Sequence, residues 1–215
     1  MSKPKNTDTI RQAYNKAAAK YGESFFYELY SKPLDVKLLD LFCERINSEM
    51  PVCEIGCGPG EISTYLKYKG LNLISIDISE EMIRIAKELN PNIDYRVGDV
   101  FGLDFPENYF SGVIAPFLFV NYTPVEIRKA FIEIRRVLKS KGIFYFSFHA
   151  GTESLTNPDF LVENNPLEFH FLDPEEIVKL LEDCGFEIIE WVLRSPYKER
   201  EYASKRAYIF TRNIK

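Results

Sequence analysis

The stretch from Pro51 to Gly60 combines one acid with three glycines at alternate positions. Its first part, Val52–Ile55, is apolar apart from Glu54 and predicts a buried strand. Glycine lets a backbone turn tightly and approach a ligand, because it has no Cβ atom. A strand, a glycine turn and the N-terminus of a helix, in that order, can hold a nucleotide-like ligand.

A second acid stands at the end of the next predicted strand, 71–77. Asp77 comes 17 residues after Gly60, and a carboxylate at the tip of the second strand can accept hydrogen bonds from both hydroxyls of a ribose. The dinucleotide motif G-x-G-x-x-G would need a glycine where this chain has Glu61. The spacing therefore disfavours a nicotinamide-dependent enzyme.

Predicted strands alternate with predicted helices as far as His149, an order typical of a parallel sheet covered on both faces. The predicted strands span Val52–Ile55, Leu73–Asp77, Ile93–Val97, Ser111–Ala115 and Ile143–His149. The C-terminal part differs, because a helix that begins after Asp173 is followed by two strand-like runs, 187–194 and 203–211. A turn-prone, charged segment separates these runs and favours an antiparallel pair.

The chain resembles the class I S-adenosylmethionine-dependent methyltransferases, in particular small bacterial enzymes related to those of ubiquinone biosynthesis. The resemblance spans roughly residues 10–213 and is carried by segments that occur in family order, namely 52–60, 75–82, 98–100, 105–114 and 135–142. It implies an α/β, Rossmann-like fold with a doubly wound, mostly parallel seven-stranded sheet, an antiparallel C-terminal strand and helices on both faces. It also implies S-adenosylmethionine as the methyl donor.

The resemblance further implies which residues contact the cofactor. The glycine loop would hold the methionine end, Asp77 the ribose, and Ile78 and Met82 the adenine face, while Asp99 and the Val100 amide would bond the adenine edge. The full set is Glu54, Gly56, Cys57, Gly58, Gly60, Asp77, Ile78, Met82, Asp99, Val100, Ala115 and Phe117. Structural alternatives remain for several of them: Glu54 could bond loop amides, Asp99 could form a turn, and Met82 could be helix core.

Aromatic and histidine side chains are the candidates for acceptor binding. Tyr14 and Tyr21 are seven residues apart in the predicted helix 7–21, so they share a face that could close over the cofactor or simply pack on the core. His149, at the end of the fifth strand, is the candidate general base, with a backbone-bonded strand-end histidine as the alternative. The predicted acceptor-binding set is Tyr14, Tyr21, Phe119, His149 and His170.

The chain of 215 residues is predicted to form a single domain. We divide it into an N-terminal helical cap over 1–50, a cofactor-binding core over 51–150, an insertion over 151–172 and a C-terminal helix and strand pair over 173–215. The insertion is long and polar and leaves the fifth strand at the active edge of the sheet, which predicts a substrate lid. Together with the aromatic linker 25–30 it would enclose the acceptor.

Composition limits the classes of partner. The net charge is −5 and no basic stripe is present, which argues against nucleic acid. The start, Met1–Asn6, is polar, and no apolar run approaches the roughly 20 residues that span a bilayer, so we expect a cytoplasmic protein that is not integral to a membrane. The four cysteines, with no C-x-x-C pair and only two histidines in the chain, predict free thiols and no metal site; they are Cys43, Cys53, Cys57 and Cys184.

Three hypotheses follow from these observations. The first is an enzyme that transfers a methyl group from S-adenosylmethionine to a small-molecule acceptor by in-line displacement. The second is a binding module that holds S-adenosylmethionine or S-adenosylhomocysteine without turnover, and the third is a nicotinamide-dependent oxidoreductase. The intact glycines and both acids favour the first, while Glu61 and the C-terminal strand pair count against the third.

Overall fold

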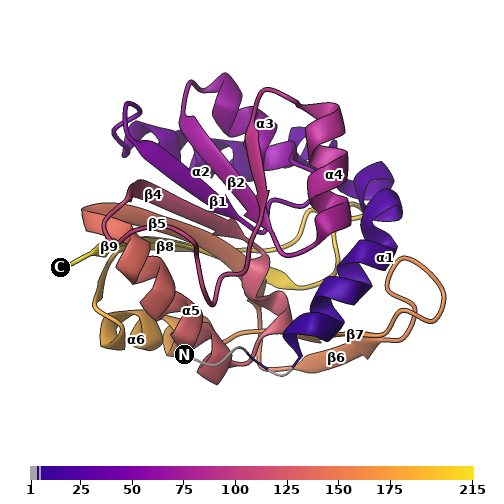
Figure 1. Ribbon diagram of the computed structural model, residues 1–215. Coiled ribbons are helices and arrows are strands. Elements are labelled where there is room, and N and C mark those ends of the chain that lie inside the picture. Colours follow the sequence, from indigo (N-terminus) through magenta and orange to yellow (C-terminus); the bar gives the residue numbers. More distant parts are fainter. Residues whose placement is uncertain (1–3, 5) are drawn as a thin grey trace.

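The computed structural model describes residue 4 and residues 6–215, so most of the polar start of the chain lies outside it. A seven-stranded sheet with the order β3-β2-β1-β4-β5-β9-β8 lies between two layers of helices (Figure 1). Its strands are β1 Pro51–Ile55, β2 Asn72–Asp77, β3 Asp94–Val97, β4 Phe110–Pro116, β5 Leu138–Ala150, β8 Phe186–Arg194 and β9 Lys205–Asn213. The first five are parallel, and β9 runs antiparallel to both β5 and β8, as predicted from the C-terminal pair.

The strand order changes direction at β1, which lies between β2 and β4. Chain segments therefore leave the carboxyl ends of β1 and β4 toward opposite faces, which opens a crevice at that edge of the sheet. The glycine loop after Ile55 and the chain after Pro116 meet at this point. The predicted strands thus deliver the glycines and the acids to one edge.

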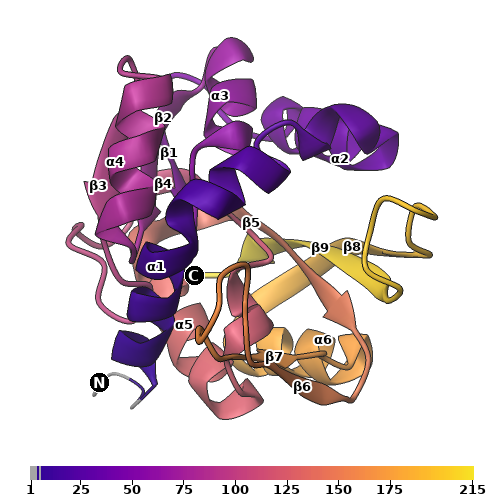
Figure 2. The same cartoon turned by 90° about the vertical axis from the view of Figure 1, so that its right-hand side faces the viewer.

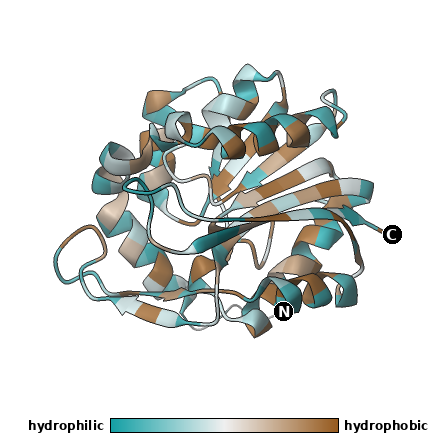
Figure 3. Ribbon diagram, turned by 180° about the vertical axis from the view of Figure 1, so that it is seen from behind, coloured by the Kyte–Doolittle hydropathy of each residue, from teal (hydrophilic) through white to brown (hydrophobic). Residues whose placement is uncertain are grey.

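The helices form the two outer layers, with α2, α3 and α4 on one face and α5 and α6 on the other (Figure 1). Apolar residues gather on the strands and on the inner faces of the helices, as Figure 3 shows, because each helix has an apolar stripe that turns toward the sheet. The helices are α1 Thr7–Phe25, α2 Pro33–Glu44, α3 Glu61–Tyr68, α4 Glu80–Leu89, α5 Pro124–Val137 and α6 Pro174–Asp183, with short 3₁₀ turns η1 Glu28–Ser31 and η2 Leu118–Asn121. None of the helices within the described residues is long and apolar enough to cross a bilayer.

Helix α1 lies beside α4, where Figures 1 and 2 both place it. Asn15 joins the two helices, because its side chain accepts a hydrogen bond from the Ser79 hydroxyl at 2.6 Å and donates one to Glu80 at 2.8 Å. Ser79 also caps α4, with its hydroxyl accepting from the Met82 amide at 3.1 Å. Ser79 therefore caps α4 and, through Asn15, fixes α1 over the edge of the sheet.

The insertion 151–172 contains a small hairpin of its own, formed by β6 Ser154–Asn157 and β7 Leu167–His170. The sequence predicted a long, polar substrate lid here. The insertion packs against α1, as Figures 1 and 2 show: the Asn165 amide donates to the Ala13 carbonyl at 3.1 Å, and Lys16 Nζ donates to the Glu163 carbonyl at 2.8 Å. It therefore supports the helix that covers the sheet edge.

Candidate functional site

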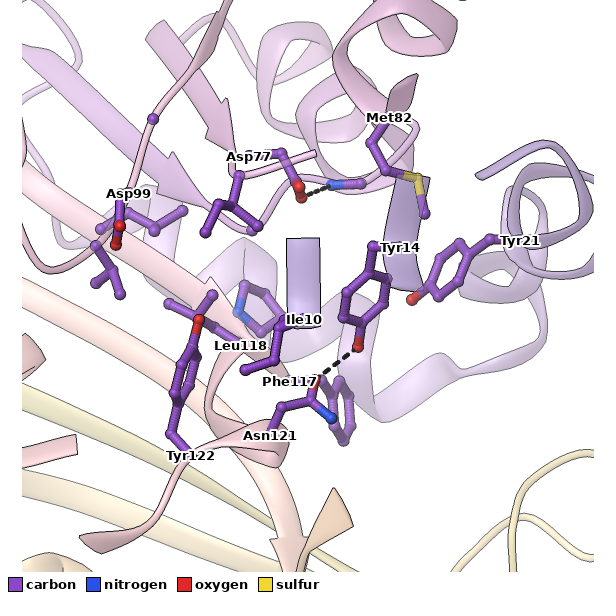
Figure 4. A pocket seen from close by; sticks show the side chains of 17 residues that line it. Ile10, Tyr14, Tyr21, Asp77, Met82, Asp99, Phe117, Leu118, Asn121 and Tyr122 are labelled. Atoms are coloured by element: carbon purple, nitrogen blue, oxygen red, sulfur yellow. Dashed lines mark hydrogen bonds between the residues drawn. The ribbon is translucent and has the colours of Figure 1, made fainter. Parts of the chain in front are cut away.

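A cavity with about 680 Å³ of empty space, part of it open to solvent, lies at the carboxyl ends of β1, β2 and β4 beneath α1 (Figure 4). In Figure 4 the two acids Asp77 and Asp99 lie on one side of it, with Tyr14, Tyr21 and Tyr122 around the rest. We name it the first cavity. Its lining residues are Ile10, Tyr14, Tyr21, Ile55, Gly56, Gly58, Asp77, Ile78, Met82, Gly98, Asp99, Val100, Pro116, Phe117, Leu118, Asn121 and Tyr122.

A second cavity, with about 810 Å³ of empty space that also opens to solvent, adjoins the first. The two share the lining residues Tyr21, Gly56, Gly58, Pro116 and Phe117. The rest of its wall comes from α1, η1, α2, α3, β5 and β9 and from the glycine loop: Phe25, Glu28, Leu29, Lys32, Asp35, Leu39, Glu54, Cys57, Pro59, Glu61, Ile62, Tyr145, Ser147 and Tyr208. A ligand in the first cavity would therefore meet a ligand in the second at Phe117.

The glycine loop is tied to β2 by backbone hydrogen bonds. The amides of Gly56 and Cys57 donate to the Ile76 carbonyl at 2.8 and 3.0 Å. Gly58 has φ +52°, and a Cβ atom added there would have only Tyr21 nearby, at 3.8 Å. Such an atom would stand in the cavity, so the bare backbone at Gly58 leaves room for a ligand.

Asp77 links the loop to the second strand. Its Oδ2 accepts from the Gly58 amide at 2.9 Å and its Oδ1 from the Ser79 amide at 2.8 Å. Burial raises the pKa of this carboxyl, while these backbone donors counteract the shift. Asp99 Oδ1 accepts from the Phe101 amide at 2.9 Å. Both acids are held by backbone donors and line the cavity.

Comparisons with known proteins agree with this geometry. The family model described as methyltransferase domain matches residues 52–142, which include the glycine loop, both acids and Phe117. The demethylmenaquinone methyltransferase of Thermotoga maritima is 26% identical over 202 residues, covering 81% of this chain and 86% of the relative. Residues 52–142 therefore form a methyltransferase domain.

Solved structures show the same fold. An S-adenosylmethionine-dependent methyltransferase from Methanosarcina mazei superposes with a TM-score of 0.73 at 21% identity, over 81% of this chain and 97% of that one. The 1,6-didemethyltoxoflavin-N1-methyltransferase of Burkholderia thailandensis, with 1,6-didemethyltoxoflavin and S-adenosylhomocysteine bound, gives 0.76 at 15% identity over 100% and 92%. Identities this low establish the architecture alone.

The cofactor of this methyltransferase is S-adenosylmethionine, and the residues of the first cavity fit it. The cavity offers two carboxylates, a bare glycine backbone and apolar side chains on either side, which is the mixture that a nucleoside with a charged tail requires. The cofactor supplies a methyl group on a positively charged sulfur, which is a good leaving group. What remains for the protein is to align an acceptor and to exclude water.

The first cavity brings together most of the predicted contacts, from the glycine loop, the second and third strands and α1. Tyr14 and Tyr21 do share a face, with ring centroids 6.2 Å apart. Glu54 and Cys57 instead line the second cavity. Gly60 lines neither: it has φ +88° at the start of α3, and a Cβ atom added there would collide with the hydroxyl of Tyr95. The third glycine is thus needed for packing.

Ala115 and Phe119 lie away from both cavities, contrary to the prediction. Each is completely buried, and the Phe119 ring packs edge-on against Phe131 and Phe146 in the core. The reason is the left-handed backbone of Phe117, at φ +53°, which begins η2. Phe117 and Leu118 line the first cavity, whereas Phe119 is turned into the core.

The two histidines also lie outside the lining of both cavities. His149 Nδ1 bonds the Ser204 hydroxyl at 2.7 Å, and burial, followed by the charges of Arg206 and Lys32, lowers its pKa to about 4. A group that weakly basic is a poor general base near neutral pH. His170 bonds Ser154 across the insertion hairpin at 2.8 Å. The cavity linings therefore give no support to either histidine as a general base or acceptor-binding group.

The insertion predicted as a lid lies behind α1 and η2. The described part of the insertion contributes no residue to the lining of either cavity. Its contacts are with α1 and with η2, where the Asn121 amide donates to the Glu168 carbonyl at 2.6 Å. Asn121 also accepts from the Tyr14 hydroxyl at 2.9 Å. The insertion therefore supports the wall of the first cavity through Asn121.

Several residues of the site were missed from the sequence. Tyr122 and Asn121 line the first cavity because η2 folds the chain after β4 back toward α1. Tyr145 and Ser147 line the second, and a serine within an otherwise aromatic strand run was a usable indication of a polar site.

All four cysteines are unpaired, and the described residues contain no cluster of three His, Cys, Asp or Glu side chains suited to a metal.

Glu54 is a buried acid whose contacts are with side chains. Its Oε2 accepts from the hydroxyls of Ser63 and Ser75, the latter at 3.1 Å, so the suggested bonds to loop amides do not form. Burial raises the pKa of Glu54 to about 8, and the serine donors only partly offset this. In the unfolded chain Glu54 has its ordinary pKa of 4.5. Between about pH 4.5 and 8 the folded chain therefore keeps a proton on Glu54 that the unfolded chain has released.

The first prediction concerns this proton. Because the folded state binds more protons between about pH 4.5 and 8, the free energy of unfolding should fall as pH rises through that window, by up to about 1.4 kcal/mol per pH unit from Glu54. Glu54→Gln keeps an acceptor for both serines and should flatten the fall. Urea unfolding of both proteins across the window measures it. Identical pH profiles would show that Glu54 is not the buried proton carrier.

Proposed function

We propose that this methyltransferase modifies a small-molecule acceptor. The observation that carries the proposal is the second cavity, which meets the cofactor cavity at Phe117 and lies between η1, α2 and the strands β5 and β9. A recess of this size suits a small molecule. The net charge of −5 disfavours nucleic acid, and relatives named for demethylmenaquinone and 1,6-didemethyltoxoflavin support a small acceptor.

We propose the following roles for the chain's own residues. Gly56 and Gly58 hold the methionine end of the cofactor, Asp77 accepts from the ribose, and Asp99 and the Val100 amide bond the adenine. Ile78 and Met82 pack on the ring, and Tyr14 and Tyr21 cover it from α1. Glu54 supports the loop through Ser63 and Ser75.

The four unpaired cysteines support a cytoplasmic location.

The test is a turnover assay that follows S-adenosylhomocysteine. Purified protein and S-adenosylmethionine are incubated with a small-molecule extract, and separately with protein, RNA and DNA fractions of the same cells. We expect product only with the small-molecule extract. Product with a macromolecular fraction alone would refute the proposal. Thermal stabilisation by S-adenosylhomocysteine and its absence with NAD is the matching check on the cofactor, since a ligand stabilises the state that it binds.

A further inference from the structure

The wall of the second cavity contains two hydroxyl groups that the protein itself does not use. Tyr145 and Ser147 are 2% and 1% exposed, and neither hydroxyl makes a hydrogen bond with residue 4 or residues 6–215. The two residues alternate along β5, so they lie on the same face of the sheet. The Tyr145 ring packs against Phe42 and Phe210. Neither oxygen is among the buried, unpaired polar atoms of the described residues, so both hydroxyls reach the open space of the cavity, where a bound molecule can pair with them.

The charged groups around this cavity are mostly paired with one another. Lys32 Nζ lies 2.8 Å from Glu28 and 3.5 Å from Glu201. Asp35 pairs with Arg194 at 2.9 Å and accepts from the Tyr208 hydroxyl at 2.8 Å. These pairs neutralise the single lysine of the wall and two of its acids, Glu28 and Asp35, so the described wall residues offer no free cation to an anionic acceptor.

Two acids of the wall, Glu54 and Glu61, have no ion-pair partner among the described residues, but Glu54 accepts from two serine hydroxyls, which leaves Glu61. Its Oε1 accepts from the Leu29 amide at 2.6 Å, while the carboxylate has no ion-pair partner among the described residues. Burial raises the pKa of Glu61 to about 7, which shows how little compensation the chain provides for its charge. A cation or an N–H donor in the cavity would supply that compensation.

We propose that the second cavity is the acceptor site and that it takes a small amine, with the nitrogen bonded to Glu61 and a polar group at the other end bonded to Tyr145 and Ser147. The proposal rests on the proposed function and adds the chemical class of the acceptor. Acceptors that carry a carboxylate or a phosphate are excluded, because they would meet Glu61 with no free cation beside it. Phe25, Leu29 and Ile62 line the same cavity and supply apolar contacts.

The experiment measures binding of matched probes to the full chain saturated with S-adenosylhomocysteine. Tyramine and 4-hydroxyphenylacetate have the same ring and differ in the charge of the tail, and histamine and imidazole-4-acetate form a second such pair. Calorimetry should show each amine binding at least about tenfold more tightly than its carboxylate. Equal binding of the paired probes, or no binding of either amine at millimolar concentration, overturns the proposal.

Variants separate the two ends of the site. Glu61→Gln keeps an acceptor for the Leu29 amide and should reduce amine binding about tenfold, with Glu88→Gln on the surface of α4 as its control. Tyr145→Phe removes only an unpaired hydroxyl and should also weaken the amine, most clearly tyramine, with the exposed Tyr68→Phe as control. Both should leave the affinity for S-adenosylhomocysteine unchanged. Unaltered amine affinity in both variants overturns the proposal.

The outcomes also distinguish this proposal from the proposed function. A turnover screen in which only carboxylates or phosphates are methylated refutes the amine and leaves a small-molecule methyltransferase standing. A screen in which only protein or nucleic acid is methylated refutes both.

Discussion

Gly58→Val is expected to weaken the binding of S-adenosylhomocysteine by about 100-fold or more, which corresponds to about 2.7 kcal/mol. The amide of Gly58 is fixed on Asp77, and a side chain added at Gly58 has no neighbour closer than Tyr21, at 3.8 Å. The valine side chain would therefore occupy space in the cofactor cavity instead of being absorbed by the core. Isothermal titration with S-adenosylhomocysteine measures the loss.

The control for this variant is Gly70→Val. Gly70 also has a left-handed backbone, at φ +86°, and no atom lies within 4 Å of an added Cβ, but it lines neither cavity. Both variants carry the strain of a β-branched residue at positive φ, so both should lower the unfolding temperature. Only Gly58→Val should lose the ligand. Normal affinity in Gly58→Val would show that the loop does not approach the cofactor.

Asp77→Ala should weaken cofactor binding by about 1–3 kcal/mol, because ribose hydroxyls would lose their acceptor. The same change leaves the amides of Gly58 and Ser79 without the carboxylate that orders them, so the unfolding temperature should fall as well. Calorimetry of the cofactor and thermal unfolding separate the two effects. Asp77→Asn, which keeps one acceptor oxygen, should fall between the wild type and Asp77→Ala in both.

Asp94→Ala is the matched control for this second prediction. Asp94 lies on the neighbouring strand β3, is exposed, and pairs with Arg96 at 2.6 Å. An exposed ion pair of this kind contributes little to stability, so neither affinity nor unfolding temperature should change measurably. If Asp77→Ala binds the cofactor as well as Asp94→Ala does, Asp77 is not part of the site.

The fold and the cofactor edge were predictable because local rules and topology agree there. Apolar runs end in Glu54, Asp77 and the segment before Asp99, and the carboxyl ends of parallel strands must lie at one edge. The antiparallel C-terminal strand followed from a turn between two strand-like runs. The strand alternation and the family resemblance thus identified the mostly parallel sheet, its antiparallel C-terminal strand and the cofactor.

The acceptor side was not predictable in the same way, because its residues come from elements with no fixed spacing between them. Tyr145 lies on β5, Glu61 at the start of α3 and Lys32 between η1 and α2, and only the packing of these elements creates a cavity. The histidines illustrate the converse. His149 ends β5, the strand on which it was predicted. Its side chain bonds Ser204, 55 residues later, and lines neither cavity.

The sequence by itself determined the parallel sheet, the glycine loop and the acids at the strand tips, because each depends on residue type and local order. The methyl donor was implied by the family resemblance. The tertiary structure alone decided which side chains face the cavities. A left-handed residue at Phe117 turned Phe119 into the core, and the hairpin of the insertion packed behind α1 instead of over the acceptor. Side-chain direction after a strand depends on backbone dihedrals and distant packing, which local pattern does not encode.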